Sequence, residues 1–273
     1  IEHYYSISKK DSFINGGQYL NFLEKMNLPF KVIQPTNKGT EITIRADELL
    51  FDSDSLRVQA KDKMKSSGVR LFLNKSTSKE DFDDFDYIVI ATYAKINDLL
   101  DKPKSYQYEV IEKPVVRLPK SYYRKSMVVM DGPFMCFDPF KNDLHVLGHV
   151  KHAIHATFID EYPNELNSFF LENLNKGIVE NPKITNIEKF IESGMQFFEK
   201  FNELEHVGSM YTIRTVLSNR DHDDARPTIV NQEEKNVFTI FSGKIGTCVE
   251  SAYNLVRLIK KPLKNNKNEI NLL

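Results

Sequence analysis

Residues 237–259 have the sequence VFTIFSGKIGTCVESAYNLVRLI, which predicts a strand, a glycine turn and a helix in direct succession. Gly243 and Gly246 allow a ligand to approach the backbone closely, and the free N–H groups at a helix start favour a negatively charged group. Lys244 adds a positive charge there. An ordinary strand-to-helix turn with an exposed lysine explains the same residues about equally well.

The helix after this turn is predicted to bury one face, because its aliphatic residues follow a 4-3-4-3 spacing. These residues are Ile245, Val249, Ala252, Val256 and Ile259.

Composition limits the classes of function. The 273 residues are enough for one large or two small domains, and the formal net charge of −1 gives no basic field for nucleic acid. No apolar stretch is long enough to span a membrane. Cys136 and Cys248 lie far apart and suggest no disulfide framework, so we expect a reducing, cytoplasmic location.

The first part of the chain predicts an α/β layer. Helices are expected over residues 14–26 and from Ser53 to just before Gly68, followed by strands at 69–73 and 87–91. The second strand is apolar throughout, which is typical of a parallel strand buried on both faces.

The middle of the chain predicts an antiparallel sheet, followed by two helices over 164–204 and further strands over 206–241. The strands expected in the sheet are Tyr106–Val116, Ser126–Met130, Phe134–Asp138 and Leu144–Val150.

The predicted turn resembles the C-terminal flavin-contacting segment of FAD-dependent oxidoreductases of the D-amino-acid oxidase/glycine oxidase type. FSGKIGTCVESA (241–252) carries this resemblance. FDYIVIATYA (85–94) is similar to a strand of the FAD sheet, and 47–74 to the segment before it. Residues 127–150 resemble paired strands of the substrate-domain sheet, and 210–230 the arginine strand before the flavin segment. Each motif is loose, but together they follow the family order.

The resemblance implies an α/β fold plus an antiparallel sheet, in which a mixed α+β substrate domain accompanies an incomplete, Rossmann-like FAD-binding layer. The FAD-binding part would comprise residues 1–100 and 205–262. The substrate domain would comprise residues 101–204, and a solvated tail 263–273.

Two features depart from the family pattern. None of the 11 glycines forms the G-x-G-x-x-G turn of an N-terminal βαβ unit, so the chain is expected to be a fragment that begins after that unit. The family strand ends in Ala-x-Gly, whereas this chain has Ala91-Thr92-Tyr93.

The resemblance also implies roles for individual residues. The flavin would be contacted by Gly243, Lys244, Ile245, Gly246 and Thr247, and the lysine would stabilise the anionic reduced flavin. Arg214 would hold a substrate carboxylate, with a salt bridge to Asp221, Asp223 or Asp224 as an equal alternative.

Histidines and one cysteine are weaker candidates. His149 or His152 could lie at the mouth of a flavin pocket, although a surface or core histidine is the more ordinary explanation. The histidines at 145, 149, 152 and 155 do not have the spacing of a zinc motif, so no metal is expected. Phe134, Met135, Cys136 and Phe137 alternate along a predicted strand, so one pair of them could line a substrate pocket. Core packing is favoured for Met135 and Phe137, and Cys136 is interpreted as a small buried residue rather than a nucleophile.

These patterns predict an FAD-dependent oxidoreductase that transfers a hydride from a C–N bond of an amine or amino acid to flavin. The electron acceptor is not specified by the sequence. The alternative is a cofactor-free remnant that acts as a binding or scaffold module, which the absent glycine fingerprint favours. A histidine-based metalloenzyme ranks last.

Overall fold

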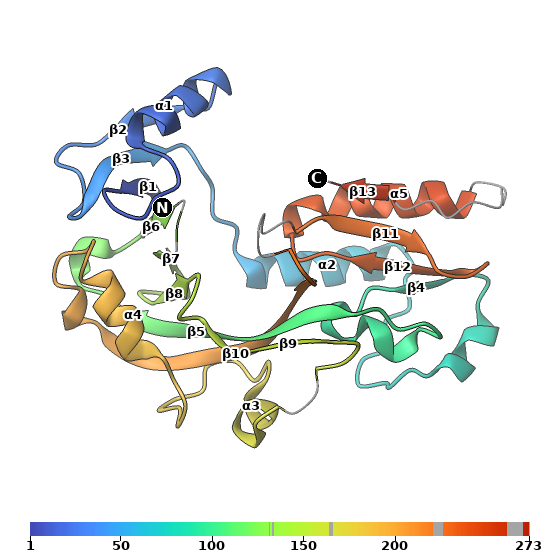
Figure 1. Ribbon diagram of the computed structural model, residues 1–273. Helices are drawn as coiled ribbons and strands as arrows, with labels where there is room; N and C mark the ends of the chain where they lie inside the picture. The colour runs from blue at the N-terminus through green and yellow to red at the C-terminus, as the bar shows by residue number, and fades with distance from the viewer. Residues whose placement is uncertain (131, 133, 164–165, 221–225, 261–269, 273) are drawn as a thin grey trace. The chain divides into compact units, whose positions relative to one another are not determined.

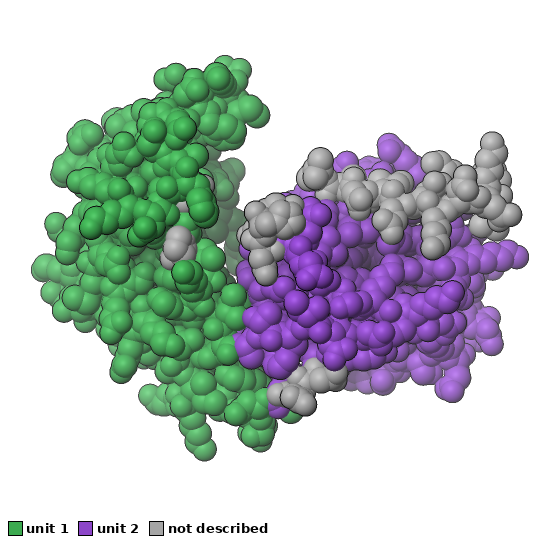
Figure 2. All heavy atoms as spheres, viewed as in Figure 1, with its two compact units in different colours: residues 1–71, 111–155, 167–212 green, residues 72–110, 156–166, 213–273 purple. Residues whose placement is uncertain are grey.

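The computed structural model describes residues 1–130, 132, 134–163, 166–220, 226–260 and 270–272 (Figure 1). The chain forms two compact units, each built from several segments (Figure 2). Unit 1 comprises residues 1–71, 111–155 and 167–212, and unit 2 comprises residues 72–110, 156–166 and 213–273.

A large mixed sheet has the strand order β10-β5-β8-β7-β6-β1-β3-β2, and β9 also pairs with β5. β1 pairs in parallel with β6 and antiparallel with β3, whereas the ladder from β6 through β7 and β8 to β5 is antiparallel. The antiparallel sheet predicted for the middle of the chain is therefore confirmed. Its strands are β1 (Glu2–Ser8), β2 (Phe30–Val32), β3 (Thr40–Ala46), β5 (Tyr106–Arg117), β6 (Lys125–Met130), β7 (Met135–Pro139), β8 (His145–His149), β9 (Ile154–Asp160) and β10 (Glu205–Leu217).

One face of this sheet in unit 1 is covered by short helical segments. These are α3 (Ser168–Asn173), α4 (Ile187–Gly194) and the 3-10 turn η4 (Phe201–Glu203). Phe137 of β7 is fully buried and lies 5.0 Å from Phe198, ring centroid to ring centroid, and 6.1 Å from Phe201. Each buried phenylalanine contributes roughly 2 kcal/mol of hydrophobic free energy, so this cluster holds η4 and the residues just before it on the sheet.

The helix predicted over 14–26 is confirmed as α1 (Gly16–Lys25). Asn15 caps it, and Gln18 completes a capping box, because each side chain bonds the other residue's backbone N–H. Tyr19 and Leu23 face β1 and β3, where they join a cluster with Ile7 and Ile44. Local capping and an amphipathic face therefore agree.

The second predicted helix is present as α2 (Ser53–Ser66), and Asp52 is its N-cap. None of its residues is buried. The strand predicted at 69–73 is wrong: these residues are not in a strand, and Val69, Leu71 and Phe72 are 51%, 49% and 65% exposed. Their alternation has no neighbouring strand in the described chain to pair with.

Unit 2 is built on a smaller mixed sheet with the order β13-β11-β12-β4. Its strands are β4 (Ile88–Ile90), β11 (Thr228–Gln232), β12 (Val237–Phe241) and β13 (Ile270–Leu272). β4 runs parallel to β12, as expected for residues 87–91. The prediction that β4 is buried on both faces is wrong, because Ile90 is buried but Val89 is 42% exposed.

After β12 the chain forms the 3-10 turn η5 (Ile245–Thr247) and then the helix α5 (Cys248–Lys260). The prediction of which face of α5 is buried is wrong. Leu255 and Leu258 pack instead on the sheet, whereas Val249 is 63% exposed. Both helix faces carry aliphatic residues, so spacing alone does not select between them.

The compact units follow other boundaries than the functional parts predicted from the sequence. Residues 1–71 join unit 1 because β1 pairs with β6 and α1 packs on β1. The assignment of 1–100 and 205–262 to a cofactor-binding part stays a prediction. Within the expected tail, 270–272 pair with β11, and the remainder lies outside the described residues. No described helix has the length and apolar character needed to cross a bilayer.

Candidate functional site

The strand, glycine turn and helix predicted at 237–259 are confirmed as β12, η5 and α5. Ser242 organises the turn: its hydroxyl accepts a hydrogen bond from the Lys244 backbone N–H at 3.1 Å and bonds Thr228 at 2.6 Å. Thr247 donates its hydroxyl to the carbonyl of Lys244 at 3.0 Å. These side chains hold the turn in a defined shape and leave its outer surface free.

The glycines of this turn are open on their side-chain side. A Cβ added at Gly246 would meet no heavy atom within 4 Å, and one added at Gly243 would be 3.6 Å from the Tyr93 hydroxyl. Lys244 is exposed and precedes η5 and α5. The turn therefore offers an accessible cationic surface at the start of a 13-residue helix.

Tyr93, at the position where the family motif has glycine, adopts a left-handed backbone with φ 53°. Its hydroxyl accepts a hydrogen bond from the Thr215 N–H at 3.0 Å, and its ring lies 6.2 Å from Phe241, centroid to centroid. Left-handed backbone is costly for a residue with a Cβ, so these contacts stabilise an unfavourable local conformation. The tyrosine thus connects the segment after β4 to β10 and β12.

Arg214, the predicted carboxylate-binding residue, lies on β10 and is paired with Glu109 of β5. Glu109 is buried and also accepts a hydrogen bond from Gln107 at 2.9 Å. The guanidinium is therefore held by a carboxylate of the chain itself, with 31% of the side chain still exposed. The alternative partners Asp221, Asp223 and Asp224 lie outside the described residues.

A small cavity of about 40 Å³ brings two of the predicted site residues together within unit 2. Arg214 and Gly243 both line it, together with Tyr93, Phe241 and Pro227. Its volume suits about one water molecule. The arginine and the glycine turn, 29 positions apart in the sequence, are therefore neighbours in space.

His149, the other predicted catalytic residue, belongs to unit 1 and is buried on β8. Its Nδ1 accepts hydrogen bonds from the backbone N–H groups of Lys151 and His152, so Nε2 carries the proton and donates to the Ser193 hydroxyl at 3.0 Å. Burial lowers the pKa of His149 to about 4, with a further contribution from His152. This is the environment of a neutral core histidine, and a catalytic role for His149 stays a prediction.

Cys136 lies on β7 and is partly buried. Burial raises the pKa of its thiol, which keeps it protonated. Met135 and Phe137 alternate with it and are buried in the core, as the sequence favoured. Among the residues that the structure describes, no group of three His, Cys, Asp or Glu side chains is placed to hold a metal ion.

Sequence reasoning missed the two buried glutamates of β5. Glu109 and Glu112 are both below 5% exposed. Their signal was a pair of acidic residues inside a stretch, Tyr106–Arg117, that otherwise forms a buried strand. A buried carboxylate requires a partner, so these positions could have been marked as ion-pair sites.

The chain is similar to known proteins in its fold and not in its sequence. No protein-family model matches the chain, and no curated protein matches it. Among solved structures, glycine oxidase from Geobacillus kaustophilus is similar, with a TM-score of 0.61 and 11% identity over 94% of this chain and 69% of that enzyme. L-proline dehydrogenase from P. horikoshii has a TM-score of 0.60 and 11% identity, over 97% of this chain and 73% of that enzyme.

Iminodiacetate oxidase from Chelativorans sp. BNC1 is also similar, with a TM-score of 0.58 and 10% identity over 97% and 74% of the two chains. These enzymes act on different amines and amino acids. The chain therefore has the fold of this class of oxidoreductases, which the sequence resemblance predicted.

Proposed function

We propose that this chain is part of an FAD-dependent oxidoreductase that oxidises a C–N bond of an amine or amino acid. The observation that carries the proposal is the open glycine turn at residues 243–247, placed between a strand and a helix in a fold shared with amine- and amino-acid-oxidising enzymes. When bound, FAD would accept the hydride removed from the substrate.

The residues of the turn fit an anionic or electron-rich group. Lys244 carries a full positive charge, and the first N–H groups of the helical segment point out of its end. Gly243 and Gly246 leave space for close approach, since no side chain of their own and no crowding neighbour fills it. These residues would hold the flavin ring and stabilise negative charge on its reduced form.

Arg214 would orient the substrate in this proposal, although its positive charge is partly neutralised by the ion pair with Glu109. Glu109 occupies one side of the guanidinium, so a substrate carboxylate would gain hydrogen bonds from the remaining N–H groups but less Coulombic attraction. Replacing Glu109 by Gln would free the positive charge. We expect Glu109→Gln to favour substrates with a carboxylate over neutral amines, as measured by the ratio of kcat/KM values.

A nucleotide-binding segment beyond these 273 residues belongs to the proposal. β4 is paired with β12 on one side, and within the described chain its other edge has no strand partner. Tyr87 and Val89 beside this edge are exposed, as are Val249 and Tyr253 of α5. An additional βαβ unit with a glycine fingerprint would pair with β4 and cover these apolar side chains.

The second candidate is a binding module without a cofactor. It is favoured by the tyrosine at position 93, which stands where the family motif has glycine. Titrating FAD against the protein and following flavin fluorescence distinguishes the two candidates. Saturable binding supports the flavoprotein, and no binding to a chain that includes any preceding segment supports the module.

Lys244→Met tests the site itself without relying on catalysis. Removing the cation is expected to weaken FAD binding about tenfold, which corresponds to about 1.4 kcal/mol. Lys235→Met, at an exposed position in the turn between β11 and β12, is the matched control and should leave FAD affinity unchanged. Equal affinities for both variants would remove Lys244 from the site.

A further inference from the structure

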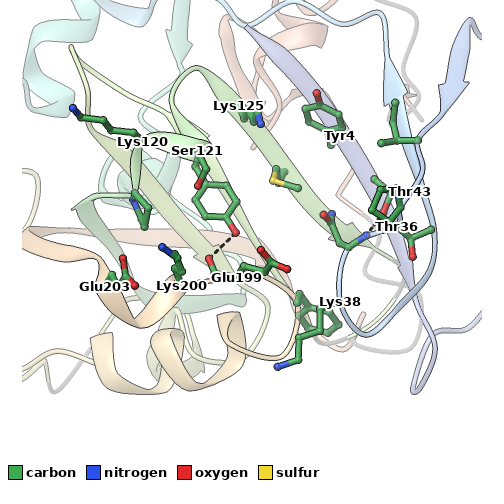
Figure 3. Close-up of a pocket in the computed structure, with 17 residues that line it drawn as sticks. Tyr4, Thr36, Lys38, Thr43, Lys120, Ser121, Lys125, Glu199, Lys200 and Glu203 are labelled. Atoms are coloured by element: carbon green, nitrogen blue, oxygen red, sulfur yellow. Dashed lines mark hydrogen bonds between the residues drawn. The ribbon is translucent and has the colours of Figure 1, made fainter.

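Unit 1 contains a pocket of about 750 Å³ that the proposed oxidoreductase chemistry does not use (Figure 3). Its walls come from β1, β3 and β6 and from the segments 33–38, 119–122 and 197–203, all of which belong to unit 1. The volume lies within the range of roughly 300–1,000 Å³ that is typical of small-molecule sites.

The lining of this pocket is cationic. It includes four lysines but only two acidic residues, Glu199 and Glu203, so two positive charges are in excess. Figure 3 shows Lys120 and Lys200 on one side of the pocket and Thr36 on the other. The lysines are Lys38, Lys120, Lys125 and Lys200.

The four lysine ammonium groups make few interactions with the rest of the described chain. Within the described part of the chain, none of the four ammonium groups is paired with a carboxylate, and Lys120 and Lys200 make no side-chain hydrogen bond. Lys38 donates to the Met195 carbonyl at 3.3 Å, and the Lys125 ammonium lies 6.0 Å from the centroid of the Tyr4 ring. Unpaired like charges around one hollow repel each other, and a bound anion would relieve that repulsion.

The backbone gives an independent sign at the same place. Lys200 has φ 54° and ψ 24°, the left-handed conformation that side chains with a Cβ rarely adopt. Asparagine or glycine would adopt it with less strain. Observed backbone strain of this kind is found preferentially at ligand-binding and active sites.

The floor of the pocket is apolar. Met127 and Phe197 are buried beneath it, and Tyr4 presents a half-buried ring beside Lys125. The hydroxyl of Tyr4 is already bonded to Glu2 at 2.9 Å, so the ring face is what Tyr4 offers to a ligand. An occupant of this pocket would therefore combine an anionic group with a flat or ring-shaped body.

We propose that this pocket binds a small phosphate ester, of the size of a nucleoside monophosphate or a sugar phosphate. A phosphate monoester carries about two negative charges at neutral pH, which matches the excess of two lysines. Lysine binds phosphate as a point charge, and the pocket is far larger than inorganic phosphate alone. The ester body would cover Tyr4 and Met127 while the phosphate lies toward Lys120 and Lys200.

Isothermal titration with AMP and with glucose 6-phosphate tests the proposal. Adenosine, glucose and inorganic phosphate serve as ligands that lack either the charge or the body. We expect at least one ester to bind at least tenfold more tightly than its uncharged counterpart and than inorganic phosphate. The affinity should fall as salt concentration rises, because the attraction is between charges.

The double variant Lys120→Gln/Lys200→Asn removes two charges while asparagine accepts the left-handed backbone. It should lose at least tenfold in ester affinity with an unchanged melting temperature in the absence of ligand. The control Lys31→Gln/Lys61→Gln removes two exposed lysines of unit 1 that lie outside the pocket and should bind as the wild type does.

The single variant Lys120→Gln repeats the test if the double variant unfolds. Failure of both esters to bind would overturn the proposal, as would equal binding of inorganic phosphate. Equal ester affinity in the wild type and in the lysine variants would overturn it too. AMP is also part of FAD, so binding is assigned to this pocket by the loss of affinity in the lysine variants and by the result for glucose 6-phosphate. The two proposals therefore fail separately.

Discussion

Glu112 is a fully buried carboxylate of unit 1, and Glu112→Gln tests what its charge contributes to stability. The side chain is fully buried on β5 and accepts hydrogen bonds on both oxygens. Oε1 accepts from the hydroxyls of Thr185 and Ser209, and Oε2 from His155 and the Asn186 N–H, the last two at 2.8 Å. The carboxylate thus joins β5, β9, β10 and the loop before α4.

The expected cost follows from the number of donors. A glutamine side chain keeps the shape but carries no charge. Its oxygen can still accept from His155 and Asn186, whereas the hydroxyls of Thr185 and Ser209 must turn to accept from its amide group. All four hydrogen bonds therefore lose the contribution of the negative charge. A hydrogen bond to a charged group contributes about 1.5–3 kcal/mol and a neutral one about 0.5–1.5 kcal/mol, so the loss over four bonds is roughly 2–4 kcal/mol. Urea unfolding monitored by tyrosine fluorescence and circular dichroism measures this difference.

The stabilisation that the Glu112 carboxylate provides is expected to decrease at low pH. Burial alone would raise the pKa of Glu112, but the hydrogen bonds from His155, Ser209, Thr185 and Asn186 outweigh it and lower the pKa below its ordinary value of 4.5. The stabilisation is therefore fully present above pH 4.5 and is lost as the pH falls through the lower folded-state pKa. The difference between wild type and Glu112→Gln should shrink over that range.

The matched control is Glu180→Gln, which changes an exposed glutamate of the same unit and should alter stability by less than about 0.5 kcal/mol. A Glu112→Gln variant as stable as this control at pH 7 would refute the reasoning. A difference that does not change between pH 7 and pH 3 would refute the assignment of the charged state.

Three further predictions concern single residues. Gly194→Ala should destabilise the protein by more than about 2 kcal/mol in urea unfolding, because the new Cβ would lie 2.2 Å from the Phe201 ring. His149 should remain neutral at pH 6 in an NMR titration, because burial lowers its pKa to about 4. Tyr93→Phe removes the hydroxyl that accepts the Thr215 N–H and should cost about 1 kcal/mol in thermal unfolding.

These predictions have defined contrary results. Gly246→Ala, at an exposed turn with open space around the glycine, is the control for Gly194→Ala, and equal effects of the two would contradict the packing argument. A titration midpoint near 6.5 for His149 would show that the ring is not buried. Tyr93→Phe with wild-type stability would mean that the Thr215 N–H has another acceptor.

Locally encoded elements could be predicted from the sequence. The helix at 14–26 was predictable because Asn15 and Gln18 form the capping box and one face is apolar. The turn at 243–247 was predictable because glycines follow an apolar strand directly. Both depend on residues within a few positions of each other.

Features that depend on distant residues could not be predicted in the same way. The orientation of α5 depends on packing of Leu255 against β11 and β12, which its own aliphatic spacing does not contain. The partner of Arg214 is Glu109, 105 positions away, and only the pairing of strands brings them together. Apolar residues alternate at 69–73, but no strand in the described chain pairs with this segment, so the predicted strand does not form.

The visible absorbance spectrum of the full-length protein, purified with any residues that precede residue 1, tests the central claim most directly. We expect a flavin spectrum, release of FAD on denaturation, and bleaching when an amine or amino-acid substrate is added without oxygen. A colourless protein that gains no thermal stability from added FAD would contradict it.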